Sequence, residues 1–341
     1  MKVHSDIDGL SFSAMKAIMR HRAKEYELTV VEDGPETLMI ETDLGQFGVT
    51  DRAPVGLRLV INAPKTDDVH VIRDALVGQI ASGVPEFADK IVWSDTAEQG
   101  QYPPNLQFAH VIGSEKLSAD FYRVKLRLER PEAFYEDDAI HFRILLPEPE
   151  NTDPDYPILL PNGSTKWPKG KKALHRPVYT VRRLEGEIVY MDVFQHEKGR
   201  ASDWARDASP GARLAIIGPG GGGMVSGGPV VLAGDETAYP AIARIMETLP
   251  ETMAGHVILL SHTGARDYPF PERRNLAVGW TDKKGFVAAT RDALSATPDC
   301  HAWIAAERGQ TGKITALDEL KSVPKTQRYI AGYWTSFKFE F

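Results

Sequence analysis

Cysteine is almost absent from the sequence: Cys300 is the only one among 341 residues. A single cysteine excludes an intramolecular disulfide and a cysteine-held iron–sulfur cluster, and it favours a reducing compartment. Long apolar runs are missing as well, since no stretch approaches the roughly 20 residues that a membrane-spanning helix requires. The first ten residues, MKVHSDIDGL, contain no apolar run typical of a signal peptide. These absences predict a cytoplasmic protein that does not enter a membrane.

An excess of basic charge is also missing. Lysine and arginine number 40 against 47 aspartate and glutamate residues, so the formal net charge is -7. Proteins that coat nucleic acid need a basic field to displace counterions, so this charge argues against that class. The local basic stretch Lys166 to Lys172 (KWPKGKK) is interpreted as a solvated loop. No metal site is expected, because His4, His21 and His70 lie on separate predicted elements without ligand spacing.

The length predicts two or three domains, because one domain ordinarily holds about 100 to 200 residues. Helical and strand patterns are mixed over residues 1–96, which predicts a small α+β domain of unknown function. The expected helices are 11–22 and 66–80, and the expected strands are 26–32, 37–41, 57–63 and 90–93. Residues 94–105 are polar with two prolines, which is typical of a linker.

Alternating strand patterns predict an antiparallel β-barrel over residues 105–226. The expected strands are 106–115, 121–128, 139–146, 178–183 and 188–196. The connection from Glu148 to Lys172 contains five prolines and is long for a loop inside a compact domain. Such connections are often functional or disordered.

Strands and helices alternate in the remainder, which predicts an α/β nucleotide-binding-like domain over residues 227–341. The expected strands are 229–233, 256–260, 276–280, 301–305 and 328–331, and the expected helices are 239–248, 286–294 and 314–320. No Gly-x-Gly-x-x-Gly follows the first strand, so the ordinary dinucleotide fingerprint is missing. Residues 335–341 alternate phenylalanine with polar residues, and a short strand and an exposed apolar end are both open alternatives.

One stretch near the middle of the chain has the features of an anion site. An alternating strand holds an aromatic ring and a hydroxyl, Tyr179 and Thr180. Arg176 and Arg182 flank this pair, and arginine side chains bind phosphate through paired N–H donors. After a returning strand, Gly199 to Ser202 should begin a helix whose free amide groups favour an anion.

This stretch resembles the siderophore-interacting proteins, a branch of the ferredoxin-reductase-like flavoproteins. The resemblance rests on Tyr-Thr-x-Arg at 179–182, on His196 before a small-residue loop that continues Ser-x-Trp-Ala, and on Gly-Pro-Gly-Gly at 218–221. Further matches are Ala-Gly-Asp-Glu-Thr-Ala at 233–238, Trp-Ile-Ala-Ala-Glu at 303–307 and Gly-Tyr-Trp at 332–334. The resemblance covers roughly residues 106–334. The layout of residues 1–96 also resembles an uncharacterised domain that precedes the reductase in some members.

The resemblance implies FAD as the cofactor and carries over its site residue by residue. The implied cofactor-binding residues are Arg176, Tyr179, Thr180, Val181, Arg182, His196, Gly199, Ala201, Ser202, Asp235, Thr237, Ala238 and Glu307. Pro177 stands where the family has its first arginine, so Arg176 is a less secure phosphate ligand than Arg182. Asp235 and Glu307 are equally well explained as helix-capping carboxylates. No catalytic acid, base or nucleophile is expected, since hydride and electron transfer require none.

The activity that the resemblance implies is FAD-dependent reduction of ferric siderophores in the cytoplasm, with release of Fe(II). Hard oxygen chelators hold Fe(III) better than Fe(II), so one electron loosens the chelate without a protein ligand to the metal. NAD(P)H is the expected donor and ferredoxin is the alternative. Arg308, Lys313 and Lys338 are the candidates for binding the anionic siderophore. Two other functions stay open: a siderophore- or flavin-binding carrier without turnover, and a general NAD(P)H:flavin reductase.

We expect the purified protein to carry FAD rather than FMN, because a helix start at Gly199 to Ser202 suits a pyrophosphate. Mass spectrometry of the flavin released by heating distinguishes the two cofactors. Recovery of FMN would contradict a pyrophosphate site at this position.

Overall fold

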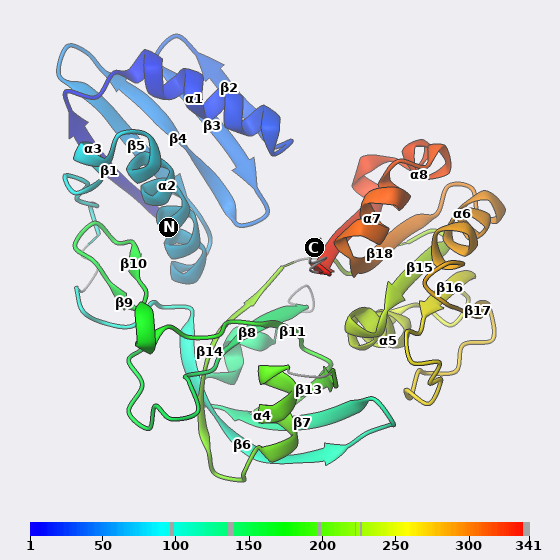
Figure 1. The fold of residues 1–341 in the computed structure, drawn as a ribbon. Helices are drawn as coiled ribbons and strands as arrows, with labels where there is room; N and C mark the ends of the chain where they lie inside the picture. The colour runs from blue at the N-terminus through cyan, green and yellow to red at the C-terminus, as the bar shows by residue number, and fades with distance from the viewer. Residues whose placement is uncertain (96–98, 136–139, 197–198, 222, 226, 337–341) are drawn as a thin grey trace, which may run out of the picture. The chain divides into compact units, whose positions relative to one another are not determined.

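The computed structural model describes residues 1–95, 99–135, 140–196, 199–221, 223–225 and 227–336. The chain forms two compact units (Figure 1). The first comprises Met1–Leu106 and Pro147–His175, and the second comprises Gln107–Leu146 and Arg176–Phe341. The proline-rich connection that was expected inside the flavin domain therefore belongs to the first unit. The division into three domains stays a prediction.

The first unit contains a five-stranded antiparallel sheet in the order β1-β5-β4-β3-β2, as expected for an α+β domain. The strands are β1 (Lys2–Asp8), β2 (Thr29–Gly34), β3 (Thr37–Thr42), β4 (Gly45–Arg52) and β5 (Gly56–Asn62), and the helices are α1 (Phe12–Glu25), α2 (Thr66–Gly83) and α3 (Pro85–Ala88). Alternate residues of β5, such as Leu59 and Ile61, enter one core with Met15 and Met19 of α1. Both expected helices are confirmed. β1 and β4 were not predicted.

A short hairpin of the inserted segment is hydrogen-bonded to α3 and to Trp93 of the first unit. Its strands are β9 (Ile158–Leu159) and β10 (Thr165–Lys166), and the 3-10 turn η2 (Gly170–Lys172) follows. The Trp93 indole donates to the carbonyl of Asn162 at 2.9 Å, and the buried Asn162 amide donates to the carbonyl of Ala88 at 3.1 Å. Asn162 also accepts from the backbone and hydroxyl of Ser164. The strand expected at 90–93 is wrong: this segment makes one isolated bridge, Ser5 to Trp93, and the indole anchors the hairpin instead.

The second unit begins with a seven-stranded antiparallel sheet in the order β11-β8-β14-β6-β7-β13-β12. The strands are β6 (Leu106–Lys116), β7 (Phe121–Leu128), β8 (His141–Leu145), β11 (Val178–Thr180), β12 (Arg183–Glu185), β13 (Ile188–Phe194) and β14 (Arg213–Gly220), with η1 (Pro131–Phe134) and α4 (Arg200–Asp207) between them. β14 was not predicted. Closure of this sheet into a barrel stays a prediction.

The strand expected at 178–183 is two strands that pair with different neighbours. Val181 N–H donates to the carbonyl of Ile140 beside β8, whereas Arg182 N–H donates to the carbonyl of Tyr190 in β13, both at 2.9 Å. Between Val181 and Arg182 the chain therefore passes from β11, the first strand in the order, to β12, the last.

The second unit continues with a parallel sheet in the order β17-β16-β15-β18-β19, which confirms the expected α/β lobe (yellow-green to red in Figure 1). The elements are β15 (Val230–Asp235), η3 (Glu236–Ala238), α5 (Tyr239–Thr248), β16 (Gly255–Leu260), β17 (Leu276–Thr281), α6 (Phe286–Ala296), β18 (His301–Glu307), α7 (Arg308–Thr315), α8 (Asp318–Ser322), η4 (Lys325–Gln327) and β19 (Arg328–Trp334). The helix expected at 314–320 is wrong, because Leu317 is extended and separates α7 from α8.

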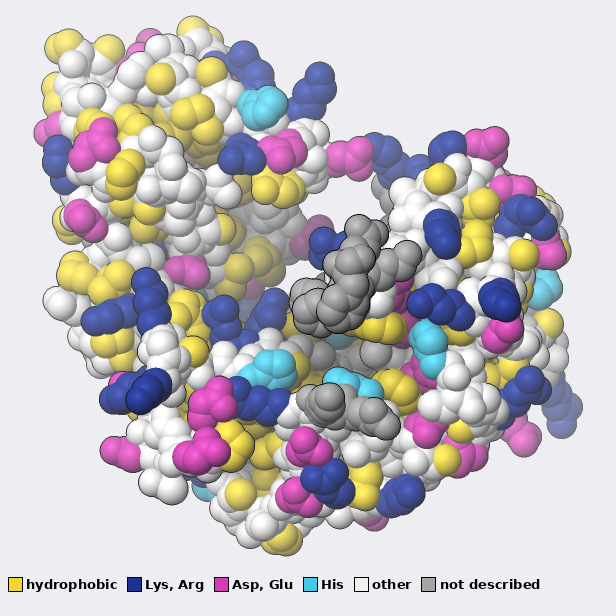
Figure 2. All heavy atoms as spheres, viewed as in Figure 1, with side chains coloured by type: hydrophobic (Ala, Val, Ile, Leu, Met, Phe, Trp, Pro, Cys, Tyr) yellow, Lys and Arg dark blue, Asp and Glu magenta, His cyan; other side chains and the backbone are white. Residues whose placement is uncertain are grey.

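The surface carries both signs of charge. Lys and Arg side chains stand among Asp and Glu side chains over the face seen in Figure 2. An anion site in a protein of net charge -7 must therefore be local. Among the described residues, no helix has both the length and the apolar composition to cross a bilayer. Residues 335–341 were expected to form a short strand or an exposed apolar end. Residues 337–341 of this tail lie outside the described residues.

We expect Asn162→Ala to destabilise the first unit, because it removes the side-chain bonds to Ala88 and Ser164 from a buried position. The loss should be about 1 to 3 kcal/mol, as for a buried hydrogen-bonding group left without its partner. Hydrogen exchange of α2 and α3 in the full chain should rise. The control is Asn275→Ala, whose exposed amide donates to the carbonyl of Glu251. Equal exchange in the two variants would contradict the anchoring role.

Candidate functional site

The strand β11 holds the aromatic and hydroxyl groups of the expected flavin site against β8. Val178 pairs with Arg143, Tyr179 with Phe142, and Thr180 with His141. Thr180 is buried, and Tyr179 is partly buried against the core of the antiparallel sheet. The ring of Tyr179 is thus fixed by packing and keeps part of its surface accessible, as a stacking platform requires.

Arg143 was not predicted as a site residue, and it lies next to Arg176. Arg143 Nη1 donates to the carbonyl of Arg176 at 3.2 Å. Burial lowers the pKa of the Arg143 guanidinium, and the charge of Arg176 lowers it further. Within the described parts of the chain, no carboxylate forms an ion pair with Arg143. An anion bound beside these two cations would offset their repulsion.

The start of α4 adds amide groups and a further arginine to this region. Gly199 is the N-cap, as expected, and the helix begins at Arg200. Arg200 donates to the carbonyl of Leu146, just after β8, at 2.9 Å. A Cβ at Gly199 would lie 2.6 Å from the His196 ring and from Ser202 Oγ, so a side chain there would have to displace these groups. The helix start and β8 therefore meet at one place.

The side chains of Ala201 and Ser202 support the α4 loop from within, whereas the side chain of His196 is exposed. Ala201 and Ser202 are buried. The Ser202 hydroxyl donates to the carbonyl of Phe194 at 3.1 Å and accepts from the backbone of His196 at 3.4 Å. The Ser202 hydroxyl is therefore occupied, and the group of Ser202 that could bind an anion is its backbone N–H in the first turn of α4.

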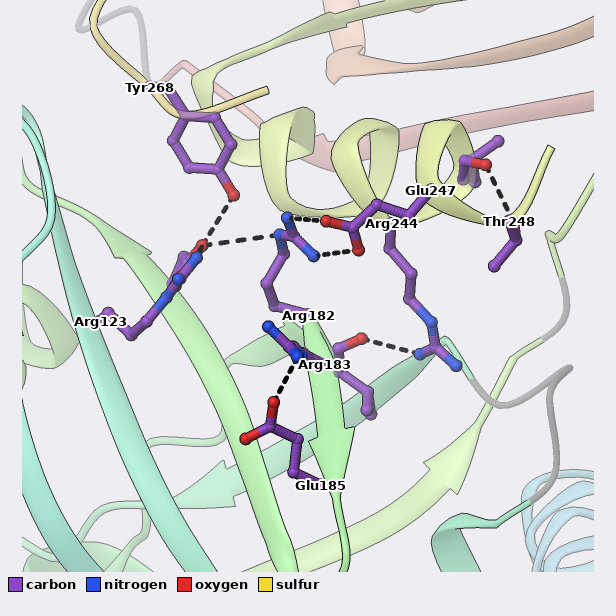
Figure 3. Close-up of polar contacts among 11 residues, drawn as sticks. Arg123, Arg182, Arg183, Glu185, Arg244, Glu247, Thr248 and Tyr268 are labelled. Carbon is purple, nitrogen blue, oxygen red and sulfur yellow. Dashed lines mark hydrogen bonds and ion pairs between the residues drawn. The ribbon is translucent and has the colours of Figure 1, made fainter. Parts of the chain in front are cut away.

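Arg182 makes an ion pair with α5 (Figure 3). Its Nη1 and Nη2 donate to the two carboxylate oxygens of Glu247, each at 2.7 Å, and its side chain is 6% exposed. Burial opposes the charge of Arg182, yet the bonds to Glu247 raise the pKa of this guanidinium overall. Arg182 thus has a carboxylate partner on α5, because its backbone leaves the β8 ladder for β13. Its ranking above Arg176 as a phosphate ligand stays a prediction.

A second ion pair continues the same network. Arg123 donates through Nε and Nη2 to both oxygens of Asp192, each at 2.7 Å, and Tyr268 donates to Asp192 Oδ2 at 2.7 Å. Arg182 Nε lies 3.9 Å from the same oxygen. The Asp192 side chain is completely buried. These contacts join the antiparallel sheet to the loop between β16 and β17.

The carboxylates of the parallel sheet cap local structure. Asp235 accepts from the backbone and hydroxyl of Thr237 at 3.1 and 2.5 Å, from the Glu307 backbone at 2.8 Å, and from the Trp334 indole at 2.8 Å. Burial raises the pKa of Asp235, and these bonds oppose that shift. Glu307 accepts from Gly309 N–H at the start of α7 at 2.9 Å. Both carboxylates thus cap helical turns, as in the helix-capping alternative. Ala238 is buried in the turn that Asp235 caps.

The three basic residues expected to bind a siderophore do not form a cluster in the described structure. Arg308 begins α7, and Lys313 lies five residues later in the same helix. Five residues correspond to about 140° around a helix, so the two side chains leave α7 on different faces. Lys338 lies outside the described residues.

His141 joins the two lobes at Tyr333. The His141 Nε2 and the Tyr333 hydroxyl are 2.8 Å apart, and their rings meet edge to face. Burial, together with the nearby charge of Arg244, lowers the pKa of His141 to about 4. A neutral imidazole thus links β8 with the Gly-Tyr-Trp strand β19.

Comparison with known proteins agrees with this arrangement. A model of the siderophore-interacting FAD-binding domain matches residues 110–223, and a model of the siderophore-interacting protein matches residues 229–336. The NADPH-dependent ferric-chelate reductase of Escherichia coli (strain K12) is 26% identical over 240 residues, which span 66% of this chain and 91% of that protein. The ferric vibriobactin reductase ViuB of Vibrio cholerae serotype O1 is 32% identical over 168 residues, which span 46% of this chain and 58% of that protein.

Solved structures show the same fold. The siderophore-interacting protein SipS of Aeromonas hydrophila aligns with a TM-score of 0.56 at 22% identity, over 69% of this chain and 94% of that chain. An antiparallel FAD-binding lobe followed by a parallel nucleotide-type lobe defines the class of protein. The chain belongs to the siderophore-interacting protein family.

We expect Arg143→Ala and Arg176→Ala each to weaken FAD binding. A charge-assisted bond to phosphate contributes on the order of 1.5 to 3 kcal/mol, which is roughly tenfold to a hundredfold in affinity. Fluorescence titration of the apoprotein measures the change. The control is Arg183→Ala, because Arg183 is exposed and pairs with Glu185. Unchanged affinity in both site variants would remove this pair from the cofactor site.

Arg182→Ala should instead reduce stability. The loss should be about 3 kcal/mol, the lower end for a broken buried pair, because Glu247 is 42% exposed and screened by water. Chemical denaturation of the apoprotein measures this loss, with Arg183→Ala again as the control. Full stability together with lost FAD affinity in Arg182→Ala would contradict this structural role and support Arg182 as a phosphate ligand.

Acid should destabilise the protein through His141. The folded pKa of about 4 lies below the ordinary value of 6.5. Between these two pH values the unfolded chain binds a proton at His141 and the folded protein does not. The contribution of neutral His141 to the free energy of unfolding is therefore fully present above pH 6.5 and is lost as the pH falls toward 4. His141→Gln should flatten the decline of the unfolding free energy in this window, and His21→Gln on the exposed face of α1 should not. An unchanged decline in His141→Gln would contradict the assignment.

Proposed function

We propose that this protein is an FAD-dependent oxidoreductase that takes electrons from NADPH and reduces ferric siderophores in the cytoplasm, releasing Fe(II). The proposal rests on the contact between Arg143 and Arg176, which lie within the residues that match the FAD-binding domain model. Two arginines whose charges act on each other, together with the first amides of α4, would suit the two negative charges of a dinucleotide pyrophosphate.

The residues present suit FAD. Arg143, Arg176 and the first amides of α4 would hold the pyrophosphate, and Tyr179 would support the flat ring. The isoalloxazine ring of FAD, when bound, would accept two electrons as a hydride and pass them on one at a time. The protein groups bind it, orient it and exclude water. Arg182, held by Glu247, fixes the chain just after Thr180 and thereby sets the position of Tyr179.

The substrate class follows from the relatives. Two relatives are named as a ferric-chelate reductase and a ferric vibriobactin reductase, and the first is named as NADPH-dependent. Reduction weakens the hold of oxygen chelators on iron, so the protein needs to deliver an electron and not to ligate the metal. Ferredoxin is the competing donor.

The decisive experiment follows the flavin spectrum without oxygen. A yellow protein should bleach with NADPH, recover its colour on addition of a ferric siderophore, and form the coloured complex of an Fe(II)-specific chelator. Bleaching by reduced ferredoxin but not by NADPH would transfer the donor role to ferredoxin. A colourless protein that binds ferric siderophore would favour the carrier. Turnover of added free flavin without retained FAD would favour the general flavin reductase.

A further inference from the structure

His141 lies beside the strand that is expected to hold the flavin ring. In β8 it pairs with Thr180 of β11 on one side and with Gly220 of β14 on the other. Residues that pair directly in an antiparallel ladder carry their side chains on the same face of the sheet. The imidazole of His141 and the hydroxyl of Thr180 are therefore neighbours on one face.

The two ring nitrogens of His141 have different surroundings. Nε2 lies 2.8 Å from the hydroxyl oxygen of Tyr333. Nδ1 lies beside Gly221, where an added Cβ would be 3.3 Å from this nitrogen. In the part of the chain that the structure describes, no hydrogen bond to Nδ1 is found. One nitrogen is thus engaged with the protein, and the other keeps its hydrogen-bonding capacity.

Tyr333 extends this contact to a second phenol in the same strand, β19. Its side chain is hydrogen-bonded to the side chain of Tyr329, whose ring stacks on the buried Trp303 at a centroid distance of 5.2 Å. Burial raises the pKa of both phenols, so each keeps its proton and can pass one on only while it receives another. A chain of exchangeable protons therefore runs from His141 through Tyr333 to the half-buried Tyr329.

The proposed reaction must release a proton in each cycle. NADPH delivers a hydride, which is a proton with two electrons, and the electrons leave singly to two ferric ions. One NADPH and two ferric ions thus become one NADP⁺, two ferrous ions and one proton. This proton stays in the flavin site until another group accepts it. A neutral imidazole can accept a proton on one ring nitrogen and release one from the other.

We propose that His141, Tyr333 and Tyr329 form the path by which this proton leaves the flavin site. The inference deepens the proposed function and rests on it. The proton arrives at Nδ1 of His141, and the proton of Nε2 passes to the oxygen of Tyr333. The hydroxyl proton of Tyr333 passes to the oxygen of Tyr329, which gives its own proton to water. Each group forms one bond to hydrogen and breaks one, so none of them keeps a charge.

The test reduces the flavin chemically, so that it depends neither on NADPH nor on a siderophore. FAD-loaded protein is reduced without oxygen by stoichiometric dithionite and is then mixed with ferricyanide, a one-electron acceptor, in weak buffer with a pH-indicator dye. In the unaltered protein the dye should report one proton for each flavin, at the rate at which the flavin colour returns.

Tyr333→Phe keeps the ring and removes the hydroxyl, so it should slow proton release. The effect should be about tenfold or more, because a positioned proton-transfer group contributes on the order of a hundredfold or more and water can replace it in part. Tyr190→Phe on β13, which removes a hydroxyl bonded to Glu185, is the matched control.

Chemical rescue distinguishes a proton path from a structural contact. His141→Ala should slow proton release, and added imidazole should restore it. N-methylimidazole has the same ring with one nitrogen blocked, so it can fill the space but cannot accept and release a proton on opposite sides. Heteronuclear NMR of the histidine ring nitrogens in the apoprotein should show the proton of His141 on Nε2, and Tyr333→Phe should shift these resonances.

The outcomes separate this inference from the proposed function. Proton release at the normal rate in both Tyr333→Phe and His141→Ala would overturn the path, even where NADPH bleaches the flavin and a ferric siderophore restores its colour. Rescue of His141→Ala by neither compound, or by both equally, would overturn it too. Slow release that imidazole alone restores, in a protein whose flavin NADPH fails to bleach, would support the path and contradict the proposed donor reaction.

Discussion

The buried carboxylate of Asp192 is the constraint on which the second unit depends. A charge without solvent is costly unless opposite charges and hydrogen-bond donors surround it. Asp192 has Arg123 and Tyr268 at hydrogen-bonding distance and Arg182 slightly further away. These groups come from β7, from the loop before β17 and from the junction of β11 and β12. The two lobes must consequently pack together for the charge to be satisfied.

This requirement extends to β11, the strand that holds Tyr179 and Thr180. Val181 still bonds to the β8 side, while Arg182 already bonds to β13 and reaches Glu247 on α5. The position of Tyr179 and Thr180 is therefore set by the antiparallel sheet on one side and by the nucleotide-type lobe on the other. An apolar contact would tolerate small slips of the strand, whereas a two-bond guanidinium–carboxylate pair fixes distance and angle together. The architecture thus ties the position of β11 to the packing of the antiparallel sheet against the parallel sheet.

The sequence predicted what local pattern controls. Strong periodicity located α5 and β15, and the small residues before α4 located its start, because each signal lies within a few neighbouring residues. Long-range partners left no such signal: Glu247 is 65 positions from Arg182, so the sequence did not predict their ion pair. Arg143 stands between apolar residues of a strand, where alternation indicates only an outward side chain. Its proximity to Arg176 arises from strand pairing that the sequence does not reveal.

The inserted segment changes what kind of attachment the first unit has. The polypeptide crosses between the units at residues 106/107, 146/147 and 175/176, so three peptide connections join them. A module at the end of a single linker has only one such connection. The second and third crossings adjoin β8 and β11, the strands that carry Arg143 and Tyr179. Both of these strands therefore continue along the backbone into the first unit.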